Sequence, residues 1–256
     1  MDLLTAISLR GIVPVIKLNR PEDAAPLCGA LRRGGLPVAE ITFRTDAAEE
    51  SIRRVHAELP DVLLGAGTVL TIDQVDRAVA AGAAFIVSPG LNPTIVRHCL
   101  DIGVPILPGC ACPSDIERAL EMGLTTVKFF PAETLGGIAA IKAMSAPYGQ
   151  VTFVPTGGID AAKLPAYLAF PKVLACGGSW MVKEEWIEKG DFAAVEAATR
   201  AAVDAMLGFT LGLSDIAALA RGDQVSLKTR SRRRAEMYLA ERGVDTQGGR
   251  IALVEG

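Results

Sequence analysis

The sequence predicts an α/β fold, a (β/α)8 TIM barrel over residues 1–206 followed by a small C-terminal α+β extension over residues 207–256. Three observations favour this fold. Short β-rich runs alternate with stretches of helical periodicity along the first two thirds of the chain. The alternation yields about eight β–α units, the number that closes a barrel. A length of 256 residues with 50% hydrophobic side chains also suits one barrel-sized core.

Each expected strand is a short run rich in β-branched or aromatic residues that ends at a turn signal. The strands are expected at Ile12–Lys17, Val38–Phe43, Val62–Ala66, Phe85–Ser88, Val104–Leu107, Thr126–Phe130, Thr152–Val154 and Val173–Cys176. The expected helices begin at capping residues or prolines. They cover Pro21–Arg33, Asp46–Glu58, Thr71–Ala81, Asn92–Asp101, Pro113–Met122, Gly137–Ser145, Asp160–Leu168 and Asp191–Met206.

An open, doubly wound sheet would share this alternation of strands and helices. Such a sheet usually has a glycine-rich dinucleotide fingerprint after its first strand, and Lys17-Leu18-Asn19-Arg20 does not have that pattern. The barrel is therefore favoured.

The chain changes character after Met206. Gly208–Ala220 is mainly apolar, Arg221–Arg234 carries six basic residues, and Ile251–Val254 has the composition of a last strand. We therefore treat residues 207–256 as a separate strand–helix–strand extension.

Four arginines in this extension suggest nucleic-acid binding: Arg230, Arg232, Arg233 and Arg234. However, the segment from Met206 onward holds eight basic and six acidic residues. Its helix-like part places Ala235, Tyr238 and Leu239 on one apolar face under a solvated basic face. Because so short a unit rarely folds by itself, we expect it to dock on a barrel or on a neighbouring subunit's extension.

The composition excludes several classes of partner. A net charge of −3 and a pI near 5.5 give no overall attraction to nucleic acids or anionic membranes. No apolar run approaches the roughly 20 residues that cross a bilayer. Five cysteines form an odd set without framework spacing, and no signal-like segment begins the chain. We expect a soluble cytoplasmic protein.

Metal chemistry is also disfavoured. The two histidines, His56 and His98, lie in expected outer helices, away from the strand ends where barrel enzymes place their reacting groups. Cys110 and Cys112 follow the fifth strand, but no second pair of thiols or histidines completes four-ligand spacing. The sequence predicts no metal and no other cofactor.

Strand alternation selects a first candidate catalytic residue. In Val38–Phe43 and the residue after it, a period of two places Glu40, Thr42 and Arg44 toward the barrel interior. Burying a carboxylate and a guanidinium is unfavourable unless they are paired or used. Two interpretations of Glu40 are equally supported at this point. It either forms a buried, purely structural pair with Arg44 or transfers protons in a reaction.

The same alternation places Lys128 inward on the sixth strand, together with Thr126 and Phe130. Lysine is almost never fully buried without a reason. An apolar setting disfavours the charged ammonium and supplies the neutral amine that attacks a ketone to form an imine. The structural alternative is a lysine that is paired with a carboxylate for stability. If Lys128 were the only evidence, this structural alternative would be favoured.

Two hydroxyls end further strands. Thr68 follows Gly65-Ala66-Gly67, and Thr156 precedes Gly157-Gly158, where glycines let a ligand approach the backbone closely. Hydroxyls, a cation and a base around one lysine suit a 2-oxo acid, because its carboxylate needs donors and its methyl group must lose a proton.

Glycine pairs follow the seventh and eighth expected strands. Gly157-Gly158 and Gly177-Gly178-Ser179 lie where barrels commonly bind phosphate through backbone N–H groups. One such pair usually marks only a turn. Two pairs in these two loops favour a phosphate site.

Seven segments resemble, in order and spacing, the bacterial 2-keto-3-deoxy-6-phosphogluconate (KDPG) / 4-hydroxy-2-oxoglutarate (KHG) aldolases. They are Glu40-Ile41-Thr42-Phe43-Arg44-Thr45, Gly65-Ala66-Gly67-Thr68-Val69, Ser88-Pro89-Gly90, Pro108-Gly109, Val127-Lys128-Phe129-Phe130-Pro131-Ala132-Glu133, Pro155-Thr156-Gly157-Gly158-Ile159 and Gly177-Gly178-Ser179-Trp180. The resemblance runs from about Ile12 to Met206, and this many ordered motifs is a specific signal.

The resemblance implies a role for each candidate. Lys128 would form the Schiff base with pyruvate or its adduct, and Glu40 would move protons through a water. Arg44, Thr68 and Thr156 would contact the substrate's carboxylate and hydroxyls. Two residues would line the pocket, Pro89 and Phe130, and four would hold the phosphate: Gly157, Gly158, Gly178 and Ser179. The family also implies a homotrimer.

Two segments depart from the family's pattern. Cys110-Ala111-Cys112-Pro113 stands where many members carry a small, hydroxyl-rich stretch, which leaves the choice between substrate epimers open. Asp223–Gly256 is faintly similar to part of a vicinal-oxygen-chelate (glyoxalase-like) module, but it has no histidine, so a metal site of that kind is not expected.

The expected reaction is reversible cleavage of KDPG to pyruvate and glyceraldehyde 3-phosphate, with KHG as a second substrate. The runner-up is the galactonate-derived epimer, cleaved by the same mechanism. A phosphate-binding isomerase or epimerase would need no inward lysine on the sixth strand. A non-catalytic ligand-binding barrel would have little reason to keep both Glu40 and Lys128.

Overall fold

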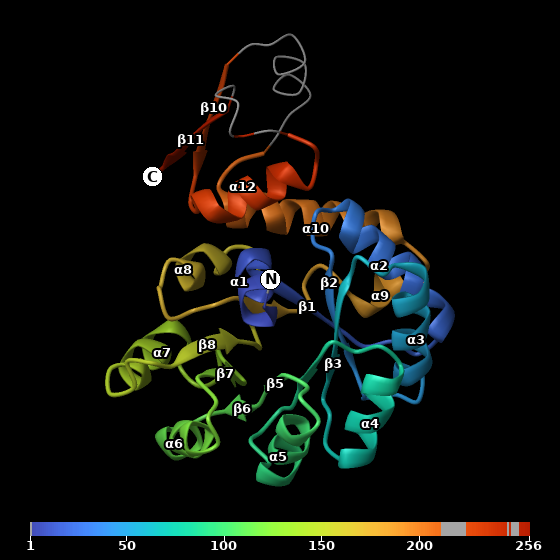
Figure 1. The fold of residues 1–256 in the computed structure, drawn as a ribbon. Coiled ribbons are helices and arrows are strands. Elements are labelled where there is room, and N and C mark those ends of the chain that lie inside the picture. Colours follow the sequence, from blue (N-terminus) through green and yellow to red (C-terminus); the bar gives the residue numbers. More distant parts are fainter. Residues whose placement is uncertain (1, 211–223, 245, 247–250) are drawn as a thin grey trace.

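The computed structural model describes residues 2–210, 224–244, 246 and 251–256, and most of the chain forms a ring of strands surrounded by helices (Figure 1). The strands of the ring are β1 (Ile12–Ile16), β2 (Val38–Thr42), β3 (Leu63–Gly67), β4 (Phe85–Val87), β5 (Ile106–Leu107), β6 (Gly109–Cys110), β7 (Thr126–Phe129), β8 (Thr152–Pro155) and β9 (Cys176–Gly178). All of their pairings are parallel.

Hydrogen bonds connect these strands in the order of a barrel. One sheet has the order β5-β4-β3-β2-β1-β9 and another has the order β6-β7-β8. The isolated bridges Phe153–Val173 and Thr156–Gly177 join the chain around β8 to the segment that contains β9. β5 pairs with β4 and β6 pairs with β7, so these two short strands share one position in the ring. Within the described residues the ring therefore closes, which confirms the predicted barrel.

Two strands differ from the prediction. The fifth is divided at Pro108, because proline has no N–H to donate, so that β5 pairs with β4 and β6 pairs with β7. The eighth was expected at Val173–Cys176, but β9 begins at Cys176 and pairs with β1 through Gly178. Gly177 and Gly178 thus lie within a strand, which their low β-propensity does not reveal.

The helices of the outer layer are α2 (Ala24–Arg33, preceded by the 3-10 turn η1, Pro21–Asp23), α3 (Ala48–Glu58), α4 (Ile72–Ala80), α5 (Pro93–Asp101), α6 (Pro113–Glu121), α7 (Gly137–Ser145), α8 (Leu164–Leu168), α9 (Glu184–Glu188) and α10 (Phe192–Leu207). The sequence did not predict α9. None of the described helices is both long and apolar enough to cross a membrane.

A further unpredicted helix, α1 (Leu3–Arg10), precedes the first strand and lies in the middle of the ring in Figure 1. The side chain of Asp2 accepts a hydrogen bond from the N–H of Thr5, which caps the helix, and Gly11 ends it with a φ of 67°. Its residues Ile7 and Leu9 are buried. The helix therefore covers one end of the barrel.

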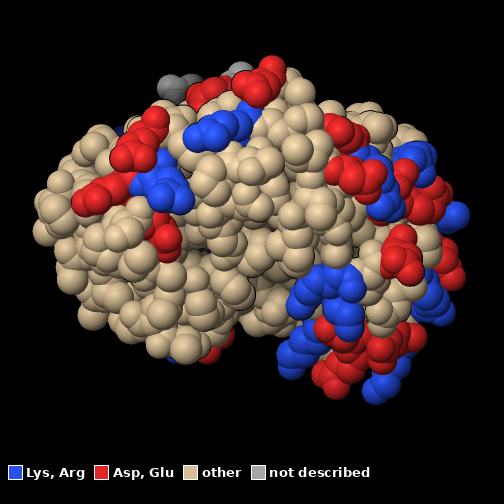
Figure 2. All heavy atoms as spheres, turned by 90° about the horizontal axis from the view of Figure 1, so that it is seen from below, with Lys and Arg blue, Asp and Glu red and all other residues tan. Residues whose placement is uncertain are grey.

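Ion pairs on the outer helices connect neighbouring charges of opposite sign. Arg77 of α4 and Arg53 of α3 both contact the carboxylate of Glu49, at 2.7 Å and 2.6 Å. Seen from below, acidic and basic groups lie in mixed clusters beside a broad area without charged side chains (Figure 2).

The C-terminal extension docks on the barrel beside α1 and α10 (Figure 1). It contains β10 (Val225–Thr229), α12 (Arg232–Ala240) and β11 (Ile251–Glu255), and its two strands pair in parallel. The apolar face of α12 is buried, as Ala235 and Leu239 are fully inaccessible to solvent. Most of the apolar segment Gly208–Ala220 and of the start of Arg221–Arg234 lies outside the described residues.

The expectation of a solvated basic face was wrong for Arg234. Its Nε donates to the carbonyl oxygen of Ser8 at 3.0 Å, and its Nη2 donates to that of Leu174 at 3.3 Å. Burial lowers the pKa of this guanidinium. Ser8 lies in the last turn of α1, whose free carbonyls favour a cation, so Arg234 joins the extension to the barrel through a helix C-terminus.

Replacing Arg234 with methionine should lower stability, because it keeps an apolar stem but leaves two half-buried carbonyls without their charged donor. We expect the free energy of unfolding to fall by about 1–3 kcal/mol, measured by thermal or urea unfolding. Arg233→Met is the matched control, since Arg233 is exposed on the same helix. Equal melting temperatures for the two variants would show that Arg234 does not hold the extension in place.

Candidate active site

One cavity of about 450 Å³ is lined by every residue that the sequence analysis proposed for catalysis, substrate binding or phosphate binding. It opens where the strands end, and residues from β1, β2, β7 and β9 and from the loops that follow the strands meet in it. Its lining includes the selected residues Lys128, Glu40, Arg44, Thr68, Pro89, Phe130, Thr156, Gly157, Gly158, Gly178 and Ser179. It also includes Thr42, which the alternation of β2 placed inward.

A buried pair of opposite charges lies in this cavity. Nζ of Lys128 on β7 is 3.4 Å from Oε1 of Glu40 on β2, and the two residues are 6% and 3% exposed. A Cβ on Gly67 would lie 2.1 Å from Oε1 of Glu40, so only glycine leaves room for the carboxylate there. The barrel thus brings an amine and a carboxylate together although 88 residues separate them.

The surroundings of Lys128 hold the amine in place. Its backbone N–H donates to the carbonyl of Pro108 at 2.9 Å, and its Nζ lies 5.4 Å from the centre of the Phe130 ring. A lysine paired with a carboxylate was the structural alternative, and the geometry shows such a pair. A pair with only a structural role would gain nothing from facing a cavity with polar walls, whereas an amine that attacks a ligand needs one.

Arg44 does not face the interior, and the alternative of a buried Glu40–Arg44 pair is wrong. Because β2 ends at Thr42, the alternation does not continue to Arg44, which is exposed at the rim of the cavity. Its Nε donates to Oγ1 of Thr42 at 3.1 Å, and Thr42 donates to the carbonyl of Ile16 at 2.8 Å. The rim position keeps the guanidinium hydrated and available to an anion.

The two predicted threonines contribute hydroxyls to the cavity wall. Thr68 follows β3 with a φ of 54°, a left-handed conformation that is rare for a β-branched residue and costs about 1–3 kcal/mol. Thr156 follows β8 and is 6% exposed. Strain of this kind is often retained at functional sites because it aims a side chain.

The glycine-rich end of the cavity presents backbone rather than side chains. Gly157 and Gly158 have φ values of 108° and 77°, which side chains rarely adopt. Ser179 directly follows β9 and is exposed, so its hydroxyl is accessible. Backbone N–H groups and a hydroxyl of this kind are suited to an oxyanion.

Sequence reasoning missed three residues of the cavity wall, Val15, Ile159 and Trp180. Val15 is apolar and inward, so its pattern is that of an ordinary core residue. Trp180 occupies the space beside Gly178, where an added Cβ would lie 1.9 Å from the indole ring. A glycine two residues before a tryptophan, in Gly178-Ser179-Trp180, was the sequence signal available for this packing.

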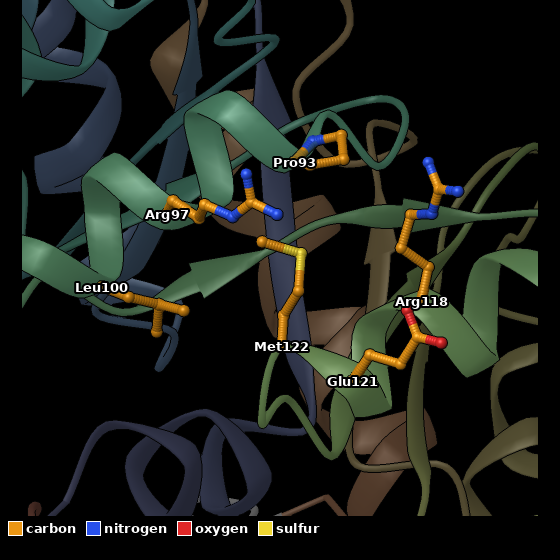
Figure 3. Close-up of a pocket in the computed structure, with 6 residues that line it drawn as sticks. All are labelled: Pro93, Arg97, Leu100, Arg118, Glu121 and Met122. Atoms are coloured by element: carbon orange, nitrogen blue, oxygen red, sulfur yellow. The ribbon is translucent and has the colours of Figure 1, made fainter.

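A larger cavity of about 600 Å³ lies outside the barrel, between α5 and α6 (Figure 3). In that view Arg97 and Met122 point toward one another across it, and Arg118 and Glu121 come from α6. Its lining contains no paired amine and carboxylate and no glycine-rich loop. We therefore place the chemistry in the smaller cavity.

The candidate metal ligands of the sequence are scattered. His56 lies on α3 and His98 on α5, where Nε2 of His98 is 2.6 Å from Asp76. Cys110 is buried, which raises its pKa to about 12, whereas Cys112 is exposed. Within the described residues no three His, Cys, Asp or Glu side chains are grouped as metal ligands would be.

Known proteins match this chain over the barrel. Residues 5–198 match the family described as KDPG and KHG aldolase. The 2-dehydro-3-deoxy-phosphogluconate aldolase of Treponema pallidum (strain Nichols) is 56% identical over 197 residues, which cover 77% of this chain and 94% of that protein.

Solved structures of aldolases also match this chain. A KDPG aldolase from Legionella pneumophila, with pyruvate captured at low pH as a covalent carbinolamine intermediate, has a TM-score of 0.76 and 39% identity over 78% of this chain and 98% of that one. A structure named "Native KDPGal structure" has a TM-score of 0.69 and 26% identity over 76% of this chain and 93% of that one.

Proposed function

Because the chain belongs to the KDPG and KHG aldolase family, we propose that it is a class I aldolase that reversibly cleaves KDPG to pyruvate and D-glyceraldehyde 3-phosphate. KHG is the expected second substrate. The observation that carries the proposal is the buried Lys128–Glu40 pair inside a polar cavity. Capture of pyruvate as a carbinolamine in the Legionella pneumophila relative supports amine chemistry at this site.

Lys128 is the nucleophile of the proposed reaction. Its neutral amine attacks the C2 carbonyl of the 2-oxo acid, and loss of water from the carbinolamine leaves a protonated imine. A base then removes the proton of the C4 hydroxyl, the C3–C4 bond breaks, and its electron pair passes to the imine nitrogen. The aldehyde leaves, and an enamine of pyruvate remains on the lysine.

Glu40 is the proposed base and acid of this sequence. Its carboxylate is 3.4 Å from Nζ of Lys128, within reach of the carbons next to the imine either directly or through one water. It receives the hydroxyl proton during cleavage and returns a proton to C3 of the enamine. Hydrolysis of the resulting imine releases pyruvate and restores the free amine.

The remaining residues orient the substrate. Arg44 at the rim and the hydroxyls of Thr68 and Thr156 are proposed to bind the carboxylate and hydroxyls, because these groups need cationic or neutral donors. Pro89 and Phe130 bound the apolar side of the cavity. Gly157, Gly158, Gly178 and Ser179 are proposed to hold the phosphate at the opposite end.

Ser179→Ala tests the phosphate site. The variant should raise the KM for KDPG by about tenfold and change the KM for the unphosphorylated KHG much less, because one hydrogen bond to a charged group is lost. Steady-state kinetics with both substrates measure the difference. Equal losses on the two substrates would make Ser179 a structural residue.

The choice of epimer is a separate part of the proposal. The gluconate series is favoured because the Treponema pallidum relative is 56% identical, whereas the structure named for KDPGal is 26% identical. The loop Cys110–Pro113 differs from the usual family stretch, and the galactonate epimer is therefore the second candidate. Assay of the purified protein with both epimers distinguishes them, and faster cleavage of the galactonate epimer would reverse the choice.

We also propose that the enzyme works in the cytoplasm without a metal or other cofactor, and as a homotrimer. The lysine imine itself supplies the electron sink that a metal would otherwise provide. The exposed side chains Leu100 and Ile102, 43% and 44% accessible in the single chain, offer apolar surface for contact between subunits. Sedimentation of the purified protein measures the subunit number, and a monomeric mass would contradict the trimer.

A further inference from the structure

An ion pair behind the cavity wall holds the loop that follows β8. Glu133 lies between β7 and α7, and Lys163 lies directly before α8. Oε2 of Glu133 is 2.8 Å from Nζ of Lys163, and the same Nζ donates to the carbonyl oxygen of Gly158 at 2.9 Å. Gly158 lines the cavity, whereas the two charged residues lie outside its lining.

Further hydrogen bonds fix both partners of this pair. The hydroxyl of Tyr167 donates to Oε1 of Glu133, and the backbone N–H of Lys163 donates to the carboxylate of Asp160 at 3.0 Å. The hydrogen bond between them lowers the pKa of Glu133 and raises that of Lys163, so both stay charged at neutral pH. Because their side chains are 31% and 45% exposed, the pair adds little stability, and its effect is mainly on geometry.

The orientation of two peptide groups follows from these contacts. The carbonyl of Gly157 accepts a hydrogen bond from the N–H of Glu133 at 3.0 Å, and the carbonyl of Gly158 accepts one from Lys163. In a trans peptide the N–H points opposite to the C=O. With both carbonyls held on the side of Glu133, the N–H groups of Gly158 and Ile159 point to the other side, toward the cavity.

These two N–H groups are available to a ligand. Within the described residues neither Gly158 nor Ile159 donates its N–H to a protein acceptor, and both residues line the cavity. Successive N–H groups that converge in this way form a nest for an anion. A Cβ on Gly158 would lie 2.8 Å from Cβ of Glu133, so glycine is needed for the loop to lie this close.

We propose that Glu133 and Lys163 are positioning residues of the phosphate site, which hold the Gly158 carbonyl so that the N–H groups of Gly158 and Ile159 face the substrate's phosphate. The inference rests on the proposed function, because it names the residues that shape the phosphate end of that same cavity. It also adds the N–H of Ile159 to the phosphate donors.

Lys163→Met tests the proposal, because methionine keeps the apolar stem and removes the ammonium. We expect the ratio of kcat/KM for KDPG over KHG to fall by about tenfold, through a higher KM for KDPG, and competitive inhibition by inorganic phosphate to weaken equally. Lys163→Arg should restore most of the ratio. The control is Lys172→Met, since Lys172 also donates to a backbone carbonyl, that of Gly149, but lies outside the cavity lining. An unchanged ratio in Lys163→Met would overturn the proposal.

Glu133→Gln separates positioning from direct binding. If Lys163 instead reached the phosphate itself, removal of the neighbouring negative charge would strengthen inhibition by inorganic phosphate. If the pair positions the loop, the loss of the ion pair releases Lys163 and weakens that inhibition. Weaker inhibition therefore supports the proposal, and stronger inhibition contradicts it.

Each variant should also be treated with pyruvate and borohydride. Trapping of pyruvate does not involve phosphate, so it reports on the lysine chemistry alone. If all variants trap pyruvate and the Lys163 and Glu133 variants still recognise phosphate as the unmodified protein does, only the positioning role of these two residues is refuted. Absence of trapping in the unmodified protein would instead refute the proposed function.

Discussion

Lys128→Arg should lower aldol cleavage of KDPG by about 10⁴-fold or more, because a guanidinium stays protonated and cannot form the imine. The variant keeps a positive charge beside Glu40, so the buried ion pair can survive and the protein should remain folded. Coupled measurement of pyruvate release, together with the melting temperature, checks both parts of this prediction.

The matched control for this variant is Lys142→Arg. Lys142 is exposed on α7 and lies outside the cavity lining, so the same chemical change there should leave turnover unchanged. Substantial activity in Lys128→Arg would mean that another amine forms the imine, and the mechanism proposed for β7 would then be wrong.

Glu40→Gln should still form the imine with pyruvate but should slow proton exchange at the pyruvate methyl group by about 10²–10⁴-fold. The amide is similar in size to the carboxylate, but it cannot accept and return a proton at neutral pH. Exchange of the methyl protons with deuterium, followed by NMR, isolates this step from cleavage and from aldehyde binding.

Glu184→Gln provides the comparison for that measurement. Glu184 is also paired with a lysine, Lys17, at 3.0 Å, but it lies outside the cavity lining. Loss of that ion pair should not slow exchange. If Glu40→Gln exchanged its methyl protons at the unmodified rate, Glu40 would be only the structural partner of Lys128.

Much of the barrel could be predicted because its strands are short apolar runs separated by capped helices, and this pattern is local. The parts that could not be predicted depend on contacts between distant segments. α1 has local capping residues, Asp2 and Gly11, but its position across one end of the barrel depends on contacts with distant segments. β9 contains two glycines and is a strand because it pairs with β1, and one of its glycines, Gly177, also bridges to Thr156 after β8.

In the candidate active site, too, local patterns could be predicted from the sequence and contacts between distant segments could not. Alternation placed Glu40 and Lys128 inward, and the structure puts their charged groups 3.4 Å apart, a distance that depends on how the barrel closes. Alternation failed at Arg44 because β2 had already ended. It also could not reveal Lys163, whose exposed side chain reads as an ordinary surface lysine until its contact with the Gly158 carbonyl is seen.

The extension was predicted as a strand, a helix and a strand, and the structure has these elements in that order. Its arginines, however, look alike in the sequence. Arg234 is distinguished from Arg233 only by the carbonyls of Ser8 and Leu174, which come from segments far away in the chain.

The most direct test of the central claim is the mass of the tryptic peptides after the intact protein is treated with pyruvate and borohydride in the presence of EDTA. We predict one reduced pyruvate adduct, located on Lys128, because only an amine forms a reducible imine and no metal is needed for that step. An adduct on another lysine, or no adduct while the protein still cleaves KDPG, would contradict the assignment of Lys128 as the nucleophile.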